Sequence, residues 1–101
     1  MKLIAEEIKR ILPKLYEQES LGYNATAYVK FFTPDSNWSW YATEFDGTDL
    51  FFGLVDGFER ELGYFSLSEL QDVKGPLGLK IERDLYFTPT TLKKIINGDP
   101  K

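Results

Sequence analysis

Asp56-Gly57 stands between two apolar segments, residues 50–55 and residues 58–65. Both turn residues tolerate the positive φ that a two-residue type I′ turn requires, so the dipeptide predicts a β-hairpin. Residues 50–55 are apolar without a break, which is typical of a strand that is covered on both faces. We therefore expect this segment to be the central strand of an antiparallel sheet.

A two-residue turn at Asp56-Gly57 also determines the register of the hairpin. The pairs that follow are Val55 with Phe58, Gly53 with Arg60, and Phe51 with Leu62. One face of the second strand then carries alternate residues, namely Phe58, Arg60, Leu62 and Tyr64. Because an unpaired buried charge is strongly destabilising, Arg60 should pair with Glu44 or Asp84, or stack on a ring. An anion-binding role for Arg60 is the open alternative.

A second hairpin is predicted upstream of the first. Residues 27–32 and residues 38–45 have the composition of strands, and the turn formers between them are Pro34, Asp35, Ser36 and Asn37. The expected pairs are Phe31 with Trp40 and Val29 with Ala42. Alternation then places aromatic rings along both faces of the meander, so both faces need to be covered.

Helical signals occur before, between and after these strands. Leucine and isoleucine recur at the helical spacing in residues 3–12, which predicts an amphipathic N-terminal helix. Ser66 and Glu69 have the spacing of a capping box, so a short helix should begin there and end near residue 73. Thr88-Pro89 predicts the N-cap and first residue of a terminal helix, and Asn97-Gly98 predicts its end.

We therefore predict a single α+β domain over residues 1–101. Its expected architecture is a four-stranded antiparallel β-meander packed with an N-terminal, a short middle and a C-terminal helix. A fifth short strand near Leu85 is the open alternative. The aromatic content of 16% supplies the large, rigid side chains that the core of such a domain needs.

The chain contains neither cysteine nor histidine. Disulfides, thiolate zinc sites and imidazole acid–base groups are therefore excluded, and we expect no cofactor. The net charge of −4, without a basic stripe, argues against tight nonspecific binding to nucleic acid. Acids near the N-terminus and the lack of a long apolar run predict a cytoplasmic protein without a membrane segment.

Trp38, Trp40 and Tyr41 form the densest aromatic cluster in the sequence, with Lys30 on the neighbouring strand. Exposed rings could stack on a nucleobase or grip a peptide side chain. Strands also favour aromatic residues, so packing in the core explains the same cluster. Both interpretations stay open, although binding of single-stranded nucleic acid normally needs a cationic groove that this acidic chain lacks.

Glu82, Arg83 and Asp84 follow a loop, residues 75–79, that contains two glycines and a proline. Alternation would direct Glu82 and Asp84 to one side of an extended segment and Arg83 to the other. Two acids so placed can hold Mg²⁺ or act as an acid–base pair if a third ligand converges on them. Solvated surface acids are far commoner, so the sequence predicts no metal ligand here.

A family resemblance extends over nearly the whole chain. It is carried by several segments in the same order along the sequence, namely residues 29–34, 37–41, 44–46, 51–55, 62–67, 75–79 and 82–87. Taken together, they resemble the domain-of-unknown-function 2958 family. The resemblance implies a small bacterial protein of a kind often encoded on plasmids, conjugative elements or phage-like islands. It implies no activity, cofactor or catalytic residue.

Two functional hypotheses follow. The first is a non-enzymatic protein-interaction or accessory module of mobile genetic elements, in which the sheet or its edge docks a protein partner. The second is a metal-assisted hydrolase or small-ligand enzyme, with converging Glu44, Arg60, Glu82 and Asp84. The absence of the usual catalytic residues favours the first. The candidate binding residues for the two hypotheses together are Trp38, Trp40, Tyr41, Glu44, Arg60, Glu82, Arg83 and Asp84.

Overall fold

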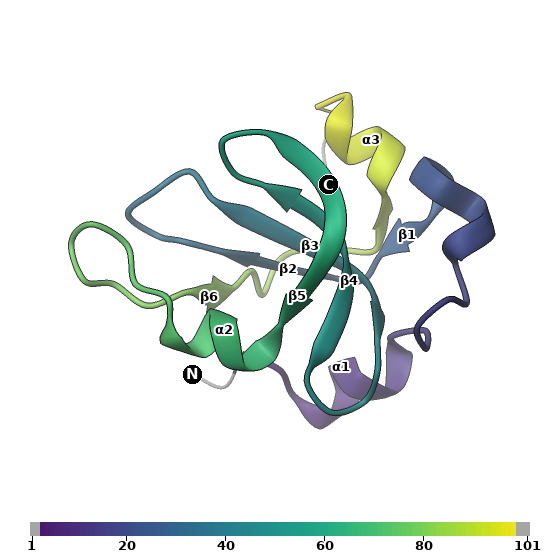
Figure 1. The fold of residues 1–101 in the computed structure, drawn as a ribbon, viewed down its shortest axis with the longest axis horizontal. Coiled ribbons are helices and arrows are strands. Elements are labelled where there is room, and N and C mark those ends of the chain that lie inside the picture. Colours follow the sequence, from purple (N-terminus) through teal and green to yellow (C-terminus); the bar gives the residue numbers. More distant parts are fainter. Residues whose placement is uncertain (1–2, 99–101) are drawn as a thin grey trace.

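The computed structural model describes residues 3–98, which form an antiparallel sheet of five strands and a smaller sheet of two (Figure 1). The larger sheet has the order β5-β4-β3-β2-β6, and β1 pairs with β7 in the smaller one. The predicted α+β class is confirmed, and a fifth strand is present in the main sheet. The strands are β1 (Thr26–Ala27), β2 (Val29–Phe32), β3 (Ser39–Phe45), β4 (Leu50–Asp56), β5 (Arg60–Ser66), β6 (Glu82–Arg83) and β7 (Thr90–Thr91).

The helices are short, namely α1 (Glu6–Ile11), the 3₁₀ segment η1 (Glu19–Asn24), α2 (Leu67–Asp72) and α3 (Leu92–Ile96). The predicted N-terminal helix is present with narrower bounds. The predicted cap of α2 is confirmed, because Ser66 Oγ accepts a hydrogen bond from the Glu69 N–H at 3.0 Å and donates one to the Glu69 carboxylate at 2.9 Å. Within the described residues, no helix is long and apolar enough to cross a membrane.

The terminal helix begins later than Thr88-Pro89, where it was predicted. Its N-cap is Thr91, whose Oγ1 accepts a hydrogen bond from the Lys94 N–H at 3.3 Å. The residues before it are extended because β7 pairs with β1, and this pairing delays the helix. The predicted end is confirmed, since Asn97 is the C-cap and Gly98 follows with a positive φ of 77°.

The central strand of the main sheet is β3, so the prediction that residues 50–55 are central is wrong. β4 lies between β3 and the edge strand β5. Although β3 contains Thr43 and Glu44, it is more completely buried than β4. Both polar side chains have hydrogen-bond partners; Thr43 Oγ1, for example, donates to the Phe52 carbonyl at 3.0 Å. A continuous apolar run therefore indicated a covered strand but not its place in the sheet.

The register of the β2–β3 hairpin is confirmed, with Phe31 opposite Trp40 and Val29 opposite Ala42. Further along β3, a β-bulge at Thr43 interrupts the pairing with β4. A bulge inserts one residue and so reverses which face the following side chains occupy. As a result, Glu44 shares a face with Phe52, and Phe45 lies on the opposite face.

The register predicted for the β4–β5 hairpin is wrong. Asp56 pairs with Arg60, so the turn comprises residues 57–59, and Gly57 lacks the positive φ of a type I′ turn. The physical reason is the core, because this register brings the buried rings of Phe51 and Phe65 together with centroids 5.3 Å apart. The free energy gained by burying two aromatic rings is larger than the preference of Asp56-Gly57 for a two-residue turn. The observed pairs include Val55 with Glu61, Leu54 with Leu62, Gly53 with Gly63 and Phe51 with Phe65.

Side chains cover both faces of the main sheet. On one face, residues of α2 and residues flanking α1 pack over the rings of Phe31, Phe45, Phe51 and Phe65. On the other face, Leu92 and Ile95 of α3 pack over Tyr41 and Leu54. In Figure 1, α1 and α2 lie along the lower side and α3 at the top. The β2–β3 turn and the loop at residues 75–79 extend to the left beyond these helices, and the β4–β5 turn lies at the top, to the left of α3.

Candidate functional site

Trp38 lies where the β2–β3 and β4–β5 turns meet. Its ring stacks on Trp40 with centroids 5.9 Å apart, and it contacts the Phe58 ring edge-on at 5.3 Å. Trp40 is buried and Trp38 is half-buried, whereas the Phe58 side chain is 95% exposed. We name this patch the hairpin-end surface; it lines a hollow of about 540 Å³ and comprises Trp38, Val55, Phe58, Glu59 and Glu61.

The β4–β5 turn is shaped to receive the Trp38 ring. A Cβ atom on Gly57 would lie 2.3 Å from that ring, which is far inside contact distance. Gly57 is therefore required because the indole packs directly on the turn, and not because of a positive φ. Gly63 in β5 is different, since a Cβ atom there would meet no atom within 4 Å.

A second hollow, of about 310 Å³, lies on the other side of Trp38, between the β2–β3 turn and residues 73–76. Asp35 holds the neighbouring loop in place, because its Oδ2 accepts a hydrogen bond from the Leu77 N–H at 2.7 Å. The same carboxylate packs so closely on Gly75 that a Cβ atom there would overlap it. The loop is thus a turn fastened by hydrogen bonds, with the side chains of Leu77 and Leu79 exposed.

Glu59 and Glu61 give the hairpin-end surface an acidic rim. Both side chains are exposed, and within residues 3–98 neither forms an ion pair or a side-chain hydrogen bond. The ion pairs among these residues are Lys9–Glu6, Lys30–Asp84 and Arg60–Asp56. The surface therefore combines aromatic rings with two uncompensated negative charges.

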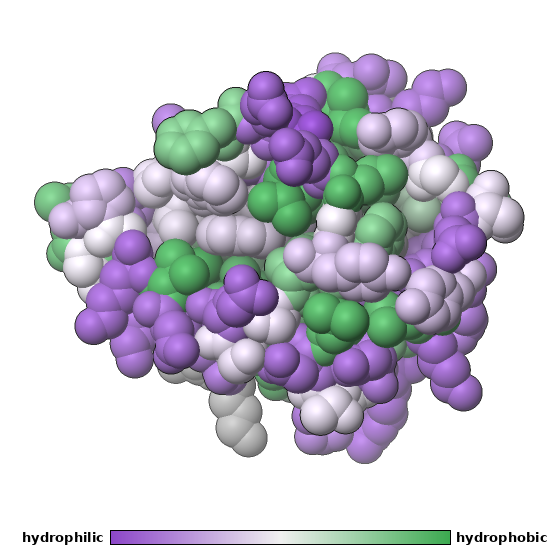
Figure 2. Space-filling model, viewed as in Figure 1, coloured by the Kyte–Doolittle hydropathy of each residue, from purple (hydrophilic) through white to green (hydrophobic). Residues whose placement is uncertain are grey.

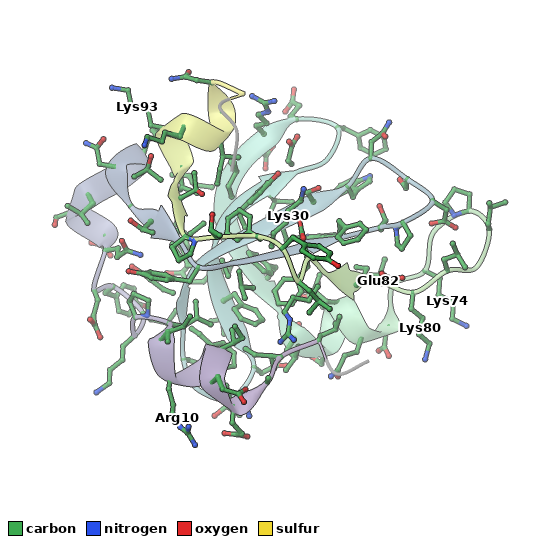
Figure 3. All side chains as sticks on the ribbon, turned by 180° about the vertical axis from the view of Figure 1, so that it is seen from behind. Arg10, Lys30, Lys74, Lys80, Glu82 and Lys93 are labelled. Atoms are coloured by element: carbon green, nitrogen blue, oxygen red, sulfur yellow. The ribbon has the colours of Figure 1, made fainter. Side chains whose placement is uncertain are left out.

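The figures place this surface among its neighbours. In Figure 2, green and pale side chains gather over the turns on the left, with strongly hydrophilic side chains above and below them. Figure 3, seen from behind, shows Lys74 and Lys80 at the base of the 75–79 loop, pointing away from the sheet. Lys74 thus borders the hollow at residues 73–76, whereas Glu59 and Glu61 border the hollow beside Phe58.

The predicted aromatic cluster is divided between the two faces of the sheet. Trp38 and Trp40 share one face, and Tyr41 lies on the other. The Tyr41 ring centroid is 5.6 Å from Lys30 Nζ and 5.9 Å from the centroid of Phe87. Burial, and to a smaller extent the charge of Asp56, raises the pKa of Tyr41. Tyr41 is therefore a core residue, separate from the hairpin-end surface.

Arg60 borders a hollow with Leu54 and Ile96, and its carboxylate partner is Asp56 rather than Glu44 or Asp84. The corrected register places it at the start of β5 with 49% of its side chain exposed, and its Nε lies 3.5 Å from Asp56 Oδ2. Its Nη1 donates to the Ile96 carbonyl at 2.8 Å. Arg60 thus links the hairpin to the end of α3, and an anion-binding role for it stays a prediction.

Glu44 is buried, with 3% of its surface exposed. Its Oε1 accepts a hydrogen bond from the Tyr16 N–H and its Oε2 accepts one from the Gln18 N–H, each at 2.8 Å. Tyr16 has a φ of 75°, a left-handed conformation that is uncommon for tyrosine. The carboxylate therefore holds the segment between α1 and η1 against the sheet.

The charged residues around β6 are dispersed. Glu82 is exposed, and Asp84 Oδ2 lies 4.0 Å from Lys30 Nζ. Arg83 lies opposite Phe31 in the sheet, and its buried Nη1 has no hydrogen-bond partner among the described residues. The three residues therefore form no common site with one another.

The four residues of the predicted enzyme site are not brought together. Glu44, Arg60 and Glu82 border three different hollows, and Asp84 lies beside Lys30. In the part of the chain that the structure describes, no group of three or more acids is placed to hold a metal ion. The four residues therefore do not converge on one pocket.

Phe58, Glu59 and Glu61 belong to the hairpin-end surface but are absent from the predicted binding residues. The type I′ register places Phe58 on the buried face, so its exposure could not be foreseen. The two-residue spacing of Glu59 and Glu61 is typical of the solvent-facing side of a strand. Whether these two acids lie next to Trp38 depends on the register of the hairpin, which their spacing does not determine.

Together these features define a small α+β domain with an aromatic, acid-rimmed surface at its hairpin turns. Residues 3–95 match the family model of DUF2958, a protein family of unknown function. The chain belongs to the DUF2958 family, and the resemblance seen in the sequence is confirmed. No curated protein and no solved structure matches the chain significantly.

Proposed function

We propose that this protein is a non-enzymatic protein-interaction module whose hairpin-end surface docks a protein partner. The observation that carries the proposal is the Phe58 ring, which is 95% exposed and packed edge-on against Trp38. A phenylalanine in this position adds little to the core. Its burial against a partner would contribute roughly 1.5–3 kcal/mol to binding.

The surroundings of Trp38 suit an interface anchor. Aromatic rings beside hollows are frequent hot spots of protein interfaces. Trp40 and the Gly57 backbone fix the indole, so a partner would lose little conformational entropy in ordering it. The hollows on both sides of Trp38 offer space for side chains of the partner.

We further propose that the partner belongs to a bacterial mobile element or its host, and that the interaction takes place in the cytoplasm. The first proposal follows from the family resemblance, and the second from the composition of the chain. Identification of the protein captured in the experiment below tests both.

The test is site-specific photocrosslinking in bacteria that carry the native gene. Benzoylphenylalanine in place of Phe58 should yield an adduct with a distinct protein, and the same residue in place of Tyr86 should yield at least about fivefold less. Tyr86 is a matched control because it is also aromatic and 91% exposed. Gly57→Ala, which displaces the Trp38 ring, should lower the yield at position 58, whereas Gly63→Ala should not.

Equal adduct yields at positions 58 and 86 would contradict the proposal, because exposure alone would then explain the crosslink. An adduct formed only with a second copy of this chain would also contradict it. In that case the hairpin-end surface would be a contact for self-association.

A further inference from the structure

We infer that the hairpin-end surface binds a protein segment in which an arginine or lysine stands next to an apolar side chain. The inference rests on the proposed function, since it names the chemistry of the partner at the same surface. It starts from one hollow, in which the rings of Trp38 and Phe58 lie beside the acids Glu59 and Glu61.

The two acids specify the charge of the segment. Glu59 directly follows Phe58 in the turn, and Glu61 lies opposite Val55 in the sheet. Any partner that covers Phe58 therefore also removes water from these carboxylates. A neutral partner would leave two desolvated charges without compensation, which strongly opposes binding. A cation on the partner removes this penalty, whereas the phosphates of a nucleic acid would increase it.

The aromatic rings favour the same kind of group. A cation is attracted to the face of an indole ring, and a guanidinium can stack on the ring while it donates hydrogen bonds to a carboxylate. A partly buried lysine of this protein already lies in a related position, between a ring and a carboxylate. Lys30 Nζ lies 5.6 Å from the Tyr41 ring centroid and 4.0 Å from Asp84 Oδ2.

The second hollow suggests how the segment is oriented. It lies across Trp38 from the acids, and its lining includes Val73, Lys74 and Pro76. Lys74 disfavours a cation there, while the apolar side chains accept an apolar group. The cation of the partner should therefore lie on the Phe58 side of Trp38, and its apolar neighbour on the other side.

Peptide selection followed by titration tests the inference. Random dodecapeptides displayed on phage are selected on the full chain, and the enriched peptides are synthesised. Binding is followed by tryptophan fluorescence, because both tryptophans of the chain, Trp38 and Trp40, lie at this site. We expect the enriched peptides to carry arginine or lysine next to an apolar residue.

Variants then separate the contribution of the two acids from that of the Phe58 ring. The double change Glu59→Gln and Glu61→Gln should raise the Kd of these peptides about tenfold. Glu7→Gln, an exposed acid on α1 away from the turns, should leave the Kd unchanged. Phe58→Ala should abolish binding, and Tyr86→Ala should not.

The outcomes distinguish this inference from the proposed function. Peptides that depend on Phe58 but carry no cation, and that ignore the two glutamine changes, would overturn the inference and leave the proposed function standing. Failure to select any peptide, or affinities that do not change with Phe58→Ala, would overturn both.

Discussion

Replacing Phe51 with alanine should lower the free energy of unfolding by about 3–5 kcal/mol. Phe51 is 0% exposed, and its ring centroid lies 4.4 Å from that of Phe45, 5.3 Å from that of Phe65 and 5.4 Å from that of Phe31. Removal of the ring leaves a cavity bounded by rigid side chains that cannot collapse into it. Equilibrium unfolding in urea, followed by circular dichroism, measures the change.

Phe58→Ala is the matched control, because it makes the same substitution in the same hairpin. The Phe58 ring is 95% exposed, so the free energy of unfolding should change by less than about 0.5 kcal/mol. This result would also show that a loss of binding in Phe58→Ala is not a loss of folding. Similar destabilisation by the two variants would contradict the observed register.

Replacing Glu44 with alanine should lower the free energy of unfolding by about 2–4 kcal/mol. The change removes both acceptors that the Tyr16 and Gln18 N–H groups use at 2.8 Å. Donors left without partners in a buried place strongly oppose folding. Urea unfolding measures the change, and hydrogen exchange at the two amides should become faster.

Two further variants make the Glu44 result specific. Glu44→Gln keeps one carbonyl oxygen, so its effect should lie between those of the native residue and alanine. Glu17→Ala removes an exposed carboxylate that accepts one hydrogen bond, from the Lys14 N–H at 2.9 Å, and should have a much smaller effect. If Glu44→Ala were as mild as Glu17→Ala, the buried carboxylate would not be what anchors this segment.

The β2–β3 hairpin could be predicted because local and tertiary preferences agree there. The turn formers and the aromatic alternation favour the same pairs, and Phe31 does lie opposite Trp40. The cap at Ser66 could be predicted for a similar reason, since its hydrogen bonds involve a residue only one helical turn away.

The β4–β5 register could not be predicted, because the ring contact that determines it lies away from the turn. The dipeptide Asp56-Gly57 favours a tight turn, but the contact of Phe51 with Phe65 favours a longer one. The resulting shift is three residues, from Phe58 to Glu61 opposite Val55. A register shift by an odd number of residues moves every β5 side chain to the opposite face of the sheet relative to β4. This error alone assigned Phe58 and Arg60 to the core.

The candidate site was foreseen in part. Trp38 and Trp40 are among the predicted binding residues; Trp38 lines the hairpin-end surface, and the buried Trp40 stacks on it. Glu44 and Arg60 were given other roles, because their actual partners include backbone groups of residues distant in the sequence. No pattern of side chains indicates that a carboxylate will meet the Tyr16 N–H or that a guanidinium will meet the Ile96 carbonyl.

The three-residue turn at 57–59 creates the hairpin-end surface, and a two-dimensional NOESY spectrum tests it most directly. We expect cross-peaks between the Phe58 ring and the Trp38 indole, and between the rings of Phe51 and Phe65, whose centroids are 5.3 Å apart in both pairs. Cross-peaks from the Phe51 ring to the Leu62 methyl groups, with none between Phe58 and Trp38, would contradict it.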